Sequence, residues 1–155
     1  MTTPKSLEAK MSQSESIKEL ATALSKVQGQ IKPAIKDSAN PFFHSTYADL
    51  ESVWNVCREP LTKNGLSILQ MPGNFFEGRM WLITRLMHSS GEWIEQEMSM
   101  PVAKQDSHGC SSAVTYMRRI SLAGFCGIVQ TDDDGNAAAQ PKAPIQNKPS
   151  LVKEM

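Results

Sequence analysis

Residues 79–102 read RMWLITRLMHSSGEWIEQEMSMPV, and this stretch decides the fold class. Its first part, Arg79–His88, contains the run WLIT, whose aromatic and β-branched side chains favour a sheet. The segment SSG that follows is typical of a turn between strands. The second part, Glu92–Val102, places Ile94, Met98, Met100 and Val102 on one face and Glu95, Glu97 and Ser99 on the other. The stretch predicts two antiparallel strands with one covered face.

Upstream of this stretch, the sequence predicts one more strand and two helices. The strand is Leu66–Met71, and Pro72-Gly73-Asn74 with Gly78 indicates the turn after it. Helix one is predicted from Ser16, where Ser16 and Glu19 have the spacing of a capping box, and it ends before Pro33. Helix two is predicted over Tyr47–Lys63 with a stop at Asn64-Gly65. Helical spacing recurs in both, at Ile17, Leu20, Ala21, Leu24, Val27 and Ile31 in the first and at Leu50, Val53, Trp54, Cys57 and Leu61 in the second.

Downstream, residues 103–110 predict a polar loop and Ser111–Phe125 a last helix, ended by Gly124 and Gly127. The element order is then α-α-β-β-β-α. The fold class predicted is α+β, with N-terminal helices, a three-stranded antiparallel meander and a following helix.

Length and composition predict one domain. The 155 residues are 40% hydrophobic, enough for one core. We expect a flexible N-terminus over residues 1–14, the domain over residues 15–137 and a disordered C-terminal tail over residues 138–155. Cys57, Cys110 and Cys126 form no CxxC pair, which favours a reducing compartment. No long apolar stretch occurs, so we expect neither secretion nor membrane insertion.

The charge balance is zero, with 16 Lys and Arg against 16 Asp and Glu. A protein that simply coats DNA is usually basic, so this balance argues against one unless the charges are segregated. Residues 61–90 and 107–131 are net basic, whereas residues 91–100 and 132–134 are net acidic. Basic and acidic surfaces can therefore lie on different faces, or meet between subunits.

The segment Lys36–Tyr47 interleaves aromatic and basic residues in a predicted loop. Aromatic faces stack on unpaired bases, and a Lys or His beside them can meet phosphate. The candidates here are Lys36, Phe43, His44 and Tyr47. The alternative is that Phe42 and Phe43 fill the core while Tyr47 packs on helix two, and the sequence leaves both interpretations open.

The last predicted helix carries a second group of candidates. Hydroxyl groups near a helix N-terminus leave main-chain amides open to an anion, and arginine forks bind phosphate. The candidates are Ser112, Thr115, Tyr116, Arg118 and Arg119, with His108 just before them. The alternative is a helix surface with serine caps and a solvated arginine pair.

The run Asp132-Asp133-Asp134 is a weak candidate for a Mg²⁺ site. Consecutive carboxylates diverge, whereas a nuclease brings them together from separate elements, so a solvated acidic loop is the preferred interpretation. The histidines and cysteines lack zinc-ligand spacing. The sequence contains no GxxxxGK[ST] and no G-x-S-x-G motif.

Several segments in register resemble the Erf family of phage single-strand DNA annealing proteins, over about residues 15–138. The matching segments are Asn40–Leu50 (NPFFHSTYADL), Leu61–Ser67 (LTKNGLS), His88–Trp93 (HSSGEW), Ser112–Arg119 (SAVTYMRR) and Asp132–Ala137 (DDDGNA). Three positions depart from the family pattern. His108, Ser111 and Ile120 stand where the family has Gln, Gly and Tyr.

The resemblance implies ATP-independent single-stranded DNA binding and annealing of complementary strands in phage homologous recombination. It also implies a ring or helical homo-oligomer, and a β-β-β-α core similar to that of eukaryotic annealing proteins. No cofactor is expected, and Mg²⁺ is not required. Expected partners are single-stranded DNA and the annealed duplex, with a host single-strand-binding protein or a phage exonuclease as further candidates, in the cytoplasm of the bacterial host.

Our hypothesis assigns phosphate contacts to Lys36, Arg118 and Arg119, with Lys63 and Lys104 as weaker candidates. Phe43, Tyr47 and Tyr116 are expected near sugar or base. The annealing protein is expected not to be an enzyme and not to hydrolyse nucleotides. Two alternatives stay open: a Mg²⁺-dependent nuclease using Asp132–Asp134, and a plain single-strand coating protein.

Overall fold

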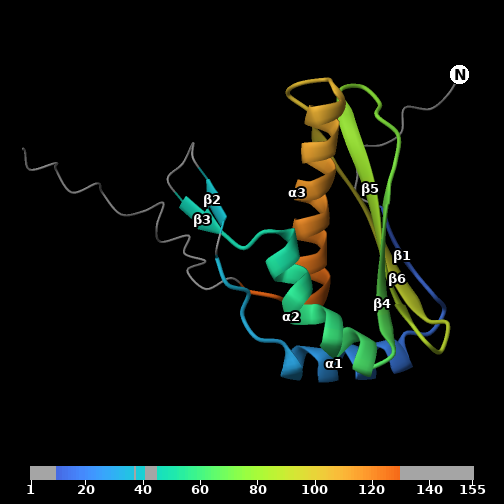
Figure 1. The fold of residues 1–155 in the computed structure, drawn as a ribbon. Coiled ribbons are helices and arrows are strands. Elements are labelled where there is room, and N and C mark those ends of the chain that lie inside the picture. The colour runs from blue at the N-terminus through green and yellow to red at the C-terminus, as the bar shows by residue number, and fades with distance from the viewer. Residues whose placement is uncertain (1–9, 37, 41–44, 130–155) are drawn as a thin grey trace, which may run out of the picture.

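The computed structural model describes residues 10–36, 38–40 and 45–129 (Figure 1). Its elements, in chain order, are β1 (Met11–Gln13), α1 (Lys18–Gln30), β2 (Ser38–Asn40), β3 (Ser45–Tyr47), α2 (Leu50–Lys63), β4 (Leu66–Pro72), β5 (Arg79–His88), β6 (Trp93–Pro101) and α3 (Ser107–Cys126). The mixed α+β class is confirmed. Helices α1 and α2 and strands β4, β5 and β6 form within a few residues of where the sequence predicted them.

The main sheet has four antiparallel strands in the order β1-β6-β5-β4, rather than the predicted three. Helix α3 runs along one face of this sheet, and α1 and α2 lie on the same side (Figure 1). The added strand, β1, lies inside the segment expected to be a flexible N-terminus. It is only three residues long, and its pairing with Ile94–Gln96 of β6 makes it a strand, so local sequence gave no signal for it.

A separate two-stranded hairpin, β2–β3, occupies part of the predicted loop between the first two helices. Ser38 pairs with Tyr47, so Tyr47 belongs to β3 and not to helix two as predicted. Helix α2 begins instead at Leu50. Its N-cap is Asp49, whose carboxylate accepts the amide of Ser52 at 2.8 Å.

The predicted capping box of α1 is wrong. The N-cap position is Ile17, and no side chain caps the helix from that position. The Ser16 hydroxyl donates to Oε1 of Glu92 at 2.9 Å, because the turn between β5 and β6 lies against the start of the helix. The carboxylate at the start of α1 is therefore that of Glu92, from far along the chain, and not that of Glu19 as predicted.

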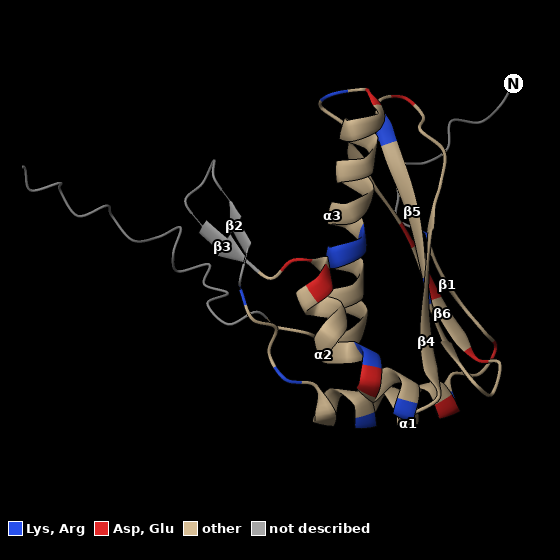
Figure 2. Cartoon of the chain, in the orientation of Figure 1, with Lys and Arg blue, Asp and Glu red and all other residues tan. Residues whose placement is uncertain are grey.

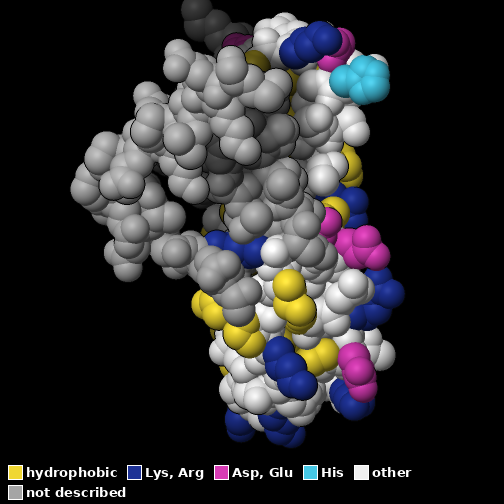
Figure 3. Space-filling view, turned by 60° about the vertical axis from the view of Figure 1, so that its left-hand side comes forward, with side chains coloured by type: hydrophobic (Ala, Val, Ile, Leu, Met, Phe, Trp, Pro, Cys, Tyr) yellow, Lys and Arg dark blue, Asp and Glu magenta, His cyan; other side chains and the backbone are white. Residues whose placement is uncertain are grey.

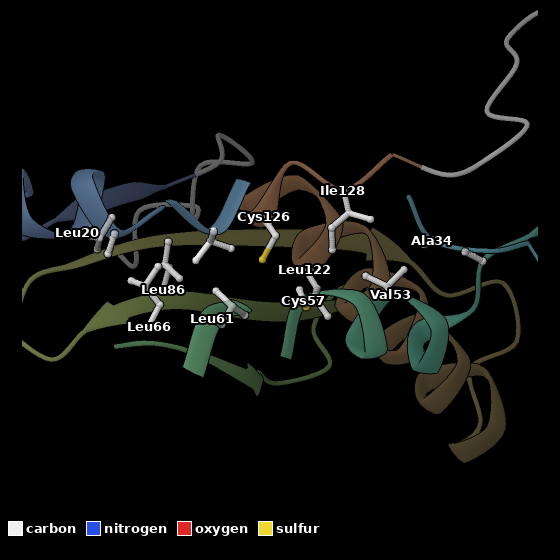
Figure 4. Packing of buried hydrophobic residues seen from close by; sticks show 13 residues of the cluster. Leu20, Ala34, Val53, Cys57, Leu61, Leu66, Leu86, Leu122, Cys126 and Ile128 are labelled. Carbon is white, nitrogen blue, oxygen red and sulfur yellow. The ribbon is translucent and has the colours of Figure 1, made fainter. Parts of the chain in front are cut away.

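The larger core cluster joins α1, α2, β4, β5 and the C-terminal half of α3. In Figure 4, Leu20 of α1, Cys57 of α2, Leu86 of β5 and Leu122 of α3 lie in the same layer. Each of these side chains is at most 1% exposed. Burying a leucine stabilises the fold by about 1.5–3 kcal/mol relative to leaving it exposed. Helix α2 therefore covers the C-terminal half of α3.

A smaller cluster lies beneath the N-terminal half of α3. There Ala113 and Met117 pack on Met80 and Leu82 of β5. This cluster contains residues from α3, from β5 and β6 and from the connection to α3, but none from α2. Among the described residues, α2 therefore does not cover the side of this half of α3 that faces away from the sheet.

Helix α3 begins four residues earlier than predicted, at Ser107, so the predicted loop 103–110 is partly wrong. Asp106 is the N-cap, and its carboxylate accepts the amide of Gly109 at 2.8 Å. A Cβ at Gly109 would stand 1.7 Å from the carbonyl oxygen of Lys104, so this tight start admits only glycine. Gly127 caps the helix as predicted, with φ of 70°, but Gly124, which was also predicted to end the helix, lies inside it.

Candidate nucleic-acid interface

The outer face of α3 is the side that points away from the sheet, from the start of the helix to just past its midpoint. It comprises His108, Ser112, Thr115, Tyr116 and Arg119, which helical spacing places on one side. The first four are exposed, and Tyr116 retains 48% of its accessible surface. The structure therefore brings together five of the twelve residues predicted to bind DNA.

Tyr116 and Arg119 form a pair on this face. The guanidinium carbon of Arg119 lies 5.1 Å from the centroid of the Tyr116 ring. At this distance the ring attracts the cation, which holds an aromatic plane and a positive charge side by side. An exposed aromatic ring beside a cation is the arrangement by which proteins bind unpaired bases and their phosphates.

Arg118 points elsewhere, because consecutive helical residues are about 100° apart. Its Nε donates to the side-chain oxygen of Gln70 at 3.4 Å, and the Gln70 amide donates to the Arg118 carbonyl at 2.9 Å. Arg118 is half-buried against the edge of β4. The two arginines that looked equivalent in sequence thus face different surroundings.

Gln70 is a residue that the sequence reasoning missed. It lies on β4, on the side of the sheet that faces α3, and also donates to the Thr84 hydroxyl at 3.3 Å. The signal was available, because alternation along the strand places this polar side chain among the inward positions of Leu66 and Ile68. A polar residue at an inward position needs a partner, and here α3 supplies it.

The expected anion site of free main-chain amides near Ser112 is not formed. Since α3 begins at Ser107, Ser112 lies in its second turn, beyond the unpaired amides of a helix start. The first turn is capped by the carboxylate of Asp106, which Lys104 approaches at 3.3 Å. A carboxylate at this position competes with phosphate for the same amides.

The predicted lysines lie apart from one another. Lys104 precedes α3 at one end of the molecule, whereas Lys63 ends α2 at the other, where it pairs with Glu59 at 2.6 Å. Figure 2 shows these two ends, with the start of α3 at the top and the end of α2 at the bottom. Lys36 is half-buried just before β2. The structure does not bring Lys63 to the outer face of α3.

Several of the remaining predicted residues lie outside the part of the chain that the structure describes. Phe43 and His44 lie outside the described residues, as do Asp132, Asp133 and Asp134. Tyr47 ends β3, and the hairpin leads from Lys36 to the start of α2 (Figure 1). The hairpin is thus attached at the end of α2 that lies beside α3.

The side of the molecule that carries the hairpin is shown in Figure 3. On its described part, basic side chains occur at several separate places with acidic ones among them. The described surface in this view therefore holds scattered cations and no single large basic patch. Phosphate binding by such a surface needs contributions from several places or several subunits.

The face of the main sheet that carries no described helix has a different character. Arg85 on β5 forms a salt bridge with Glu95 at 2.6 Å, and its guanidinium lies 4.4 Å from the Trp93 ring centroid. Arg79 donates to the Ser99 hydroxyl at 3.0 Å. Both cations are engaged with neighbouring strands of the same sheet.

The described residues hold neither a metal-binding cluster nor a membrane-spanning helix. No group of three His, Cys, Asp or Glu side chains in that part of the chain is placed to hold a metal ion. No helix within it is long and apolar enough to cross a membrane.

Comparison with known proteins gave one match. The family model of the ERF superfamily matches residues 20–154. No curated protein and no solved structure matched the chain. The family match spans α1 through α3 and includes every motif on which the predicted resemblance was based. The chain belongs to the ERF superfamily.

Proposed function

We propose that this protein binds single-stranded DNA and anneals complementary strands without ATP, as a homo-oligomer acting in phage recombination. Membership of the ERF superfamily supports the annealing activity. The structural observation that carries the proposal is the Tyr116–Arg119 pair on the outer face of α3. It offers an unpaired nucleic acid strand both a stacking surface and a cation.

In this proposal Arg119 contacts phosphate while Tyr116 packs against sugar or base. Hydroxyl groups of Ser112 and Thr115 supply further hydrogen bonds along the same face. Thr115 donates to the Ser111 carbonyl at 3.1 Å, and its oxygen can still accept. Lys36 and the hairpin would extend the contact towards α2. These contacts position the strand without reading its sequence.

In this proposal, annealing is possible because the protein leaves the base edges of the bound strand exposed. If phosphate and sugar face α3, the base edges stay accessible, and a complementary strand can pair with them. Base pairing supplies the specificity and most of the free energy, so no nucleotide hydrolysis is needed. The protein contributes order and charge neutralisation.

Assembly into an oligomer explains how a chain with zero net charge can bind DNA. One subunit offers few cations on its outer face, so its own affinity for DNA is low. Repeating the same weak contact along one strand raises the overall affinity by avidity. We place this activity in the cytoplasm of the bacterial host, with a host single-strand-binding protein or a phage exonuclease as candidate partners.

The test is an annealing assay with two complementary oligonucleotides, one of them labelled. We expect duplex formation without ATP and in the presence of EDTA, accelerated at least tenfold over protein-free DNA and weakened by salt. Strand cleavage on addition of Mg²⁺ would support a nuclease instead. Strand binding that slows pairing would support a coating protein.

A further inference from the structure

Strand β4 is one edge of the main sheet, and its outward main-chain groups have no hydrogen-bond partner among the described residues. The amide of Ser89 donates to the Gly65 carbonyl at 2.9 Å, and the amide of Gly73 donates to the Trp81 carbonyl at 2.7 Å. These two bonds fix the alternation, so the odd-numbered residues of β4 bond to β5. The amides of Leu66, Ile68 and Gln70 therefore point outward, and within the described part of the chain they donate no hydrogen bond.

Strand β1 is the opposite edge, and its phase is fixed in the same way. Ser14 donates to the Trp93 carbonyl and Glu97 donates to the Lys10 carbonyl, both at 2.9 Å. The even-numbered residues of this segment thus bond to β6. Met11 and Gln13 turn their amides and carbonyls outward, and the Met11 side chain is 73% exposed.

Neither edge strand carries a charged side chain, which is one of the protections that sheet edges usually have. Exposed edge strands are commonly blocked by charged side chains, because unpaired main-chain groups attract another strand. Strand β4 reads LSILQMP and β1 reads MSQ, with no charged residue in either. Pro72 at the end of β4 is the single blocking residue. Both edges are thus suited to accept a further strand.

We propose that β4 of one copy pairs with β1 of the next, which joins the sheets of successive copies head to tail. This inference rests on the proposed function, since it supplies the contact that builds the oligomer. Because neighbouring strands in the order β1-β6-β5-β4 all alternate in direction, β1 and β4 run oppositely. A second copy shifted along the sheet therefore presents β1 antiparallel to β4, with its helices on the same side.

Apolar surface flanks both edges, on the α3 side of the sheet at β1 and on the opposite face at β4, and the neighbouring copy's edge strand would partly cover each. A groove of about 440 Å³ lies between the β1 edge and α3, lined by Met11, Ile94, Met98, Ile120 and Phe125 among others. At the other edge Leu69 and Met71 are 40% and 37% exposed. These side chains add a hydrophobic contribution to the main-chain hydrogen bonds.

The arrangement has a consequence for DNA. A head-to-tail contact is not closed by two-fold symmetry, so it generates a ring or a helical filament. Every copy of α3 then lies on the same side of the joined sheet. The outer faces of successive α3 helices follow one another, which gives a strand of DNA one continuous track.

Disulfide cross-linking tests the pairing in the full-length protein. Ser12 on β1 and Ser67, Leu69 and Met71 on β4 all direct their side chains to the sheet face away from α3. In a Cys110→Ser background, Ser12→Cys is combined in turn with Ser67→Cys, Leu69→Cys and Met71→Cys, which covers three registers. Mild oxidation should give a ladder of covalent multimers beyond the dimer in at least one double variant. Each single variant should give none.

Two results would overturn the pairing. One is a multimeric protein that forms no ladder in any of the three double variants. The other is a Leu69→Cys single variant that cross-links into dimers to the same extent as the double variants cross-link. That result would indicate that two copies of β4 pair with each other.

A second pair of variants changes the β1 edge alone. Met11→Pro removes an outward amide but no bond to β6, whereas Met11→Val keeps that amide. We expect Met11→Pro to weaken assembly at least tenfold by analytical ultracentrifugation with an unchanged circular dichroism spectrum, and Met11→Val to assemble as the wild type does. If the wild type anneals DNA and the Met11→Pro variant is as multimeric as the wild type, the edge pairing alone is refuted. Wild-type protein that does not anneal refutes the proposed function, whatever the cross-links show.

Discussion

The main-chain amide of Leu20 donates to Oε2 of Glu92 at 2.7 Å, so a residue 72 positions away caps the first turn of α1. The other oxygen of the same carboxylate accepts from Ser16. Helix starts leave amides unpaired, and a side-chain acceptor normally comes from the adjoining residues. Here the β5–β6 turn supplies it, which ties α1 to the sheet at the same place where Ser14 bonds to Trp93.

The cap predicts a pH-dependent contribution to stability. The hydrogen bond from Leu20 holds the pKa of the Glu92 carboxyl below its ordinary value. A lowered folded-state pKa means that the contribution is present above the unfolded value, about 4.3, and is lost as the pH falls through the folded value. Glu92→Gln should therefore unfold a few degrees below the wild type at pH 7, and the gap should close as the pH falls through the lowered folded-state pKa of Glu92. Glu15→Gln, a nearby exposed carboxylate, should show no such closing gap; a gap of constant size for Glu92→Gln would refute the mechanism.

Arg118 and Arg119 should give different phenotypes. Arg119→Ala should lower affinity for single-stranded DNA several-fold and reduce the slope of log K against log salt by about 1. Arg118→Ala should lower the free energy of unfolding by about 0.5–1 kcal/mol, because it removes a half-buried bond to Gln70. The control is Arg58→Ala on α2, an exposed arginine 5.8 Å from the Trp54 ring, which should bind DNA as the wild type does. Equal DNA-binding defects in Arg58→Ala and Arg119→Ala would remove the outer face of α3 from the interface.

Tyr116 should contribute through its ring rather than its hydroxyl. Tyr116→Ala should weaken binding by about 1–3 kcal/mol, the range for loss of one stacked base. Tyr116→Phe keeps the ring and should bind within two-fold of the wild type. Fluorescence anisotropy with a labelled oligonucleotide measures both. A Phe variant as weak as the Ala variant would indicate a hydrogen bond from the hydroxyl instead of stacking.

Two glycines of α3 should respond oppositely to alanine. Gly109→Ala places a Cβ 1.7 Å from the Lys104 carbonyl, so the start of the helix must shift at a cost of about 1–3 kcal/mol. Gly124→Ala meets nothing within 4 Å and should raise stability by about 0.5–1 kcal/mol through helix propensity. Urea unfolding of both variants provides the measurement. Comparable stability of the two would mean that the connection before α3 relaxes freely.

The cysteines should differ in reactivity. Cys57 and Cys126 are fully buried between α2 and α3, whereas Cys110 is half-buried. The hydrogen bond with Cys57 and burial raise the pKa of the Cys126 thiol, so little reactive thiolate forms there. At pH 8 a thiol reagent should modify Cys110 first, and Cys57 and Cys126 only on unfolding. Rapid modification of all three in the native protein would contradict this packing of α2 on α3.

The sequence by itself determined the elements whose signal is periodic. Alternation along residues 79–102 placed two strands, and β5 begins and ends at the predicted residues Arg79 and His88. Helical spacing placed α1 and α2 to within a few residues. Motifs in register indicated the family, since such motifs keep their order along the chain. All of these signals arise from neighbours in sequence, which is why they can be read from it.

Tertiary structure decided the features that depend on residues far apart. Strand β1 is a strand because β6 lies beside it, and α1 is capped by Glu92 because the β5–β6 turn reaches it. Arg118 meets Gln70 only because α3 lies on the sheet in one particular rotation, whereas the contact between Tyr116 and Arg119, three residues apart on one helix, is local. Local sequence sets the period of a helix or strand, but packing against distant elements fixes which side is covered and which side is left to bind.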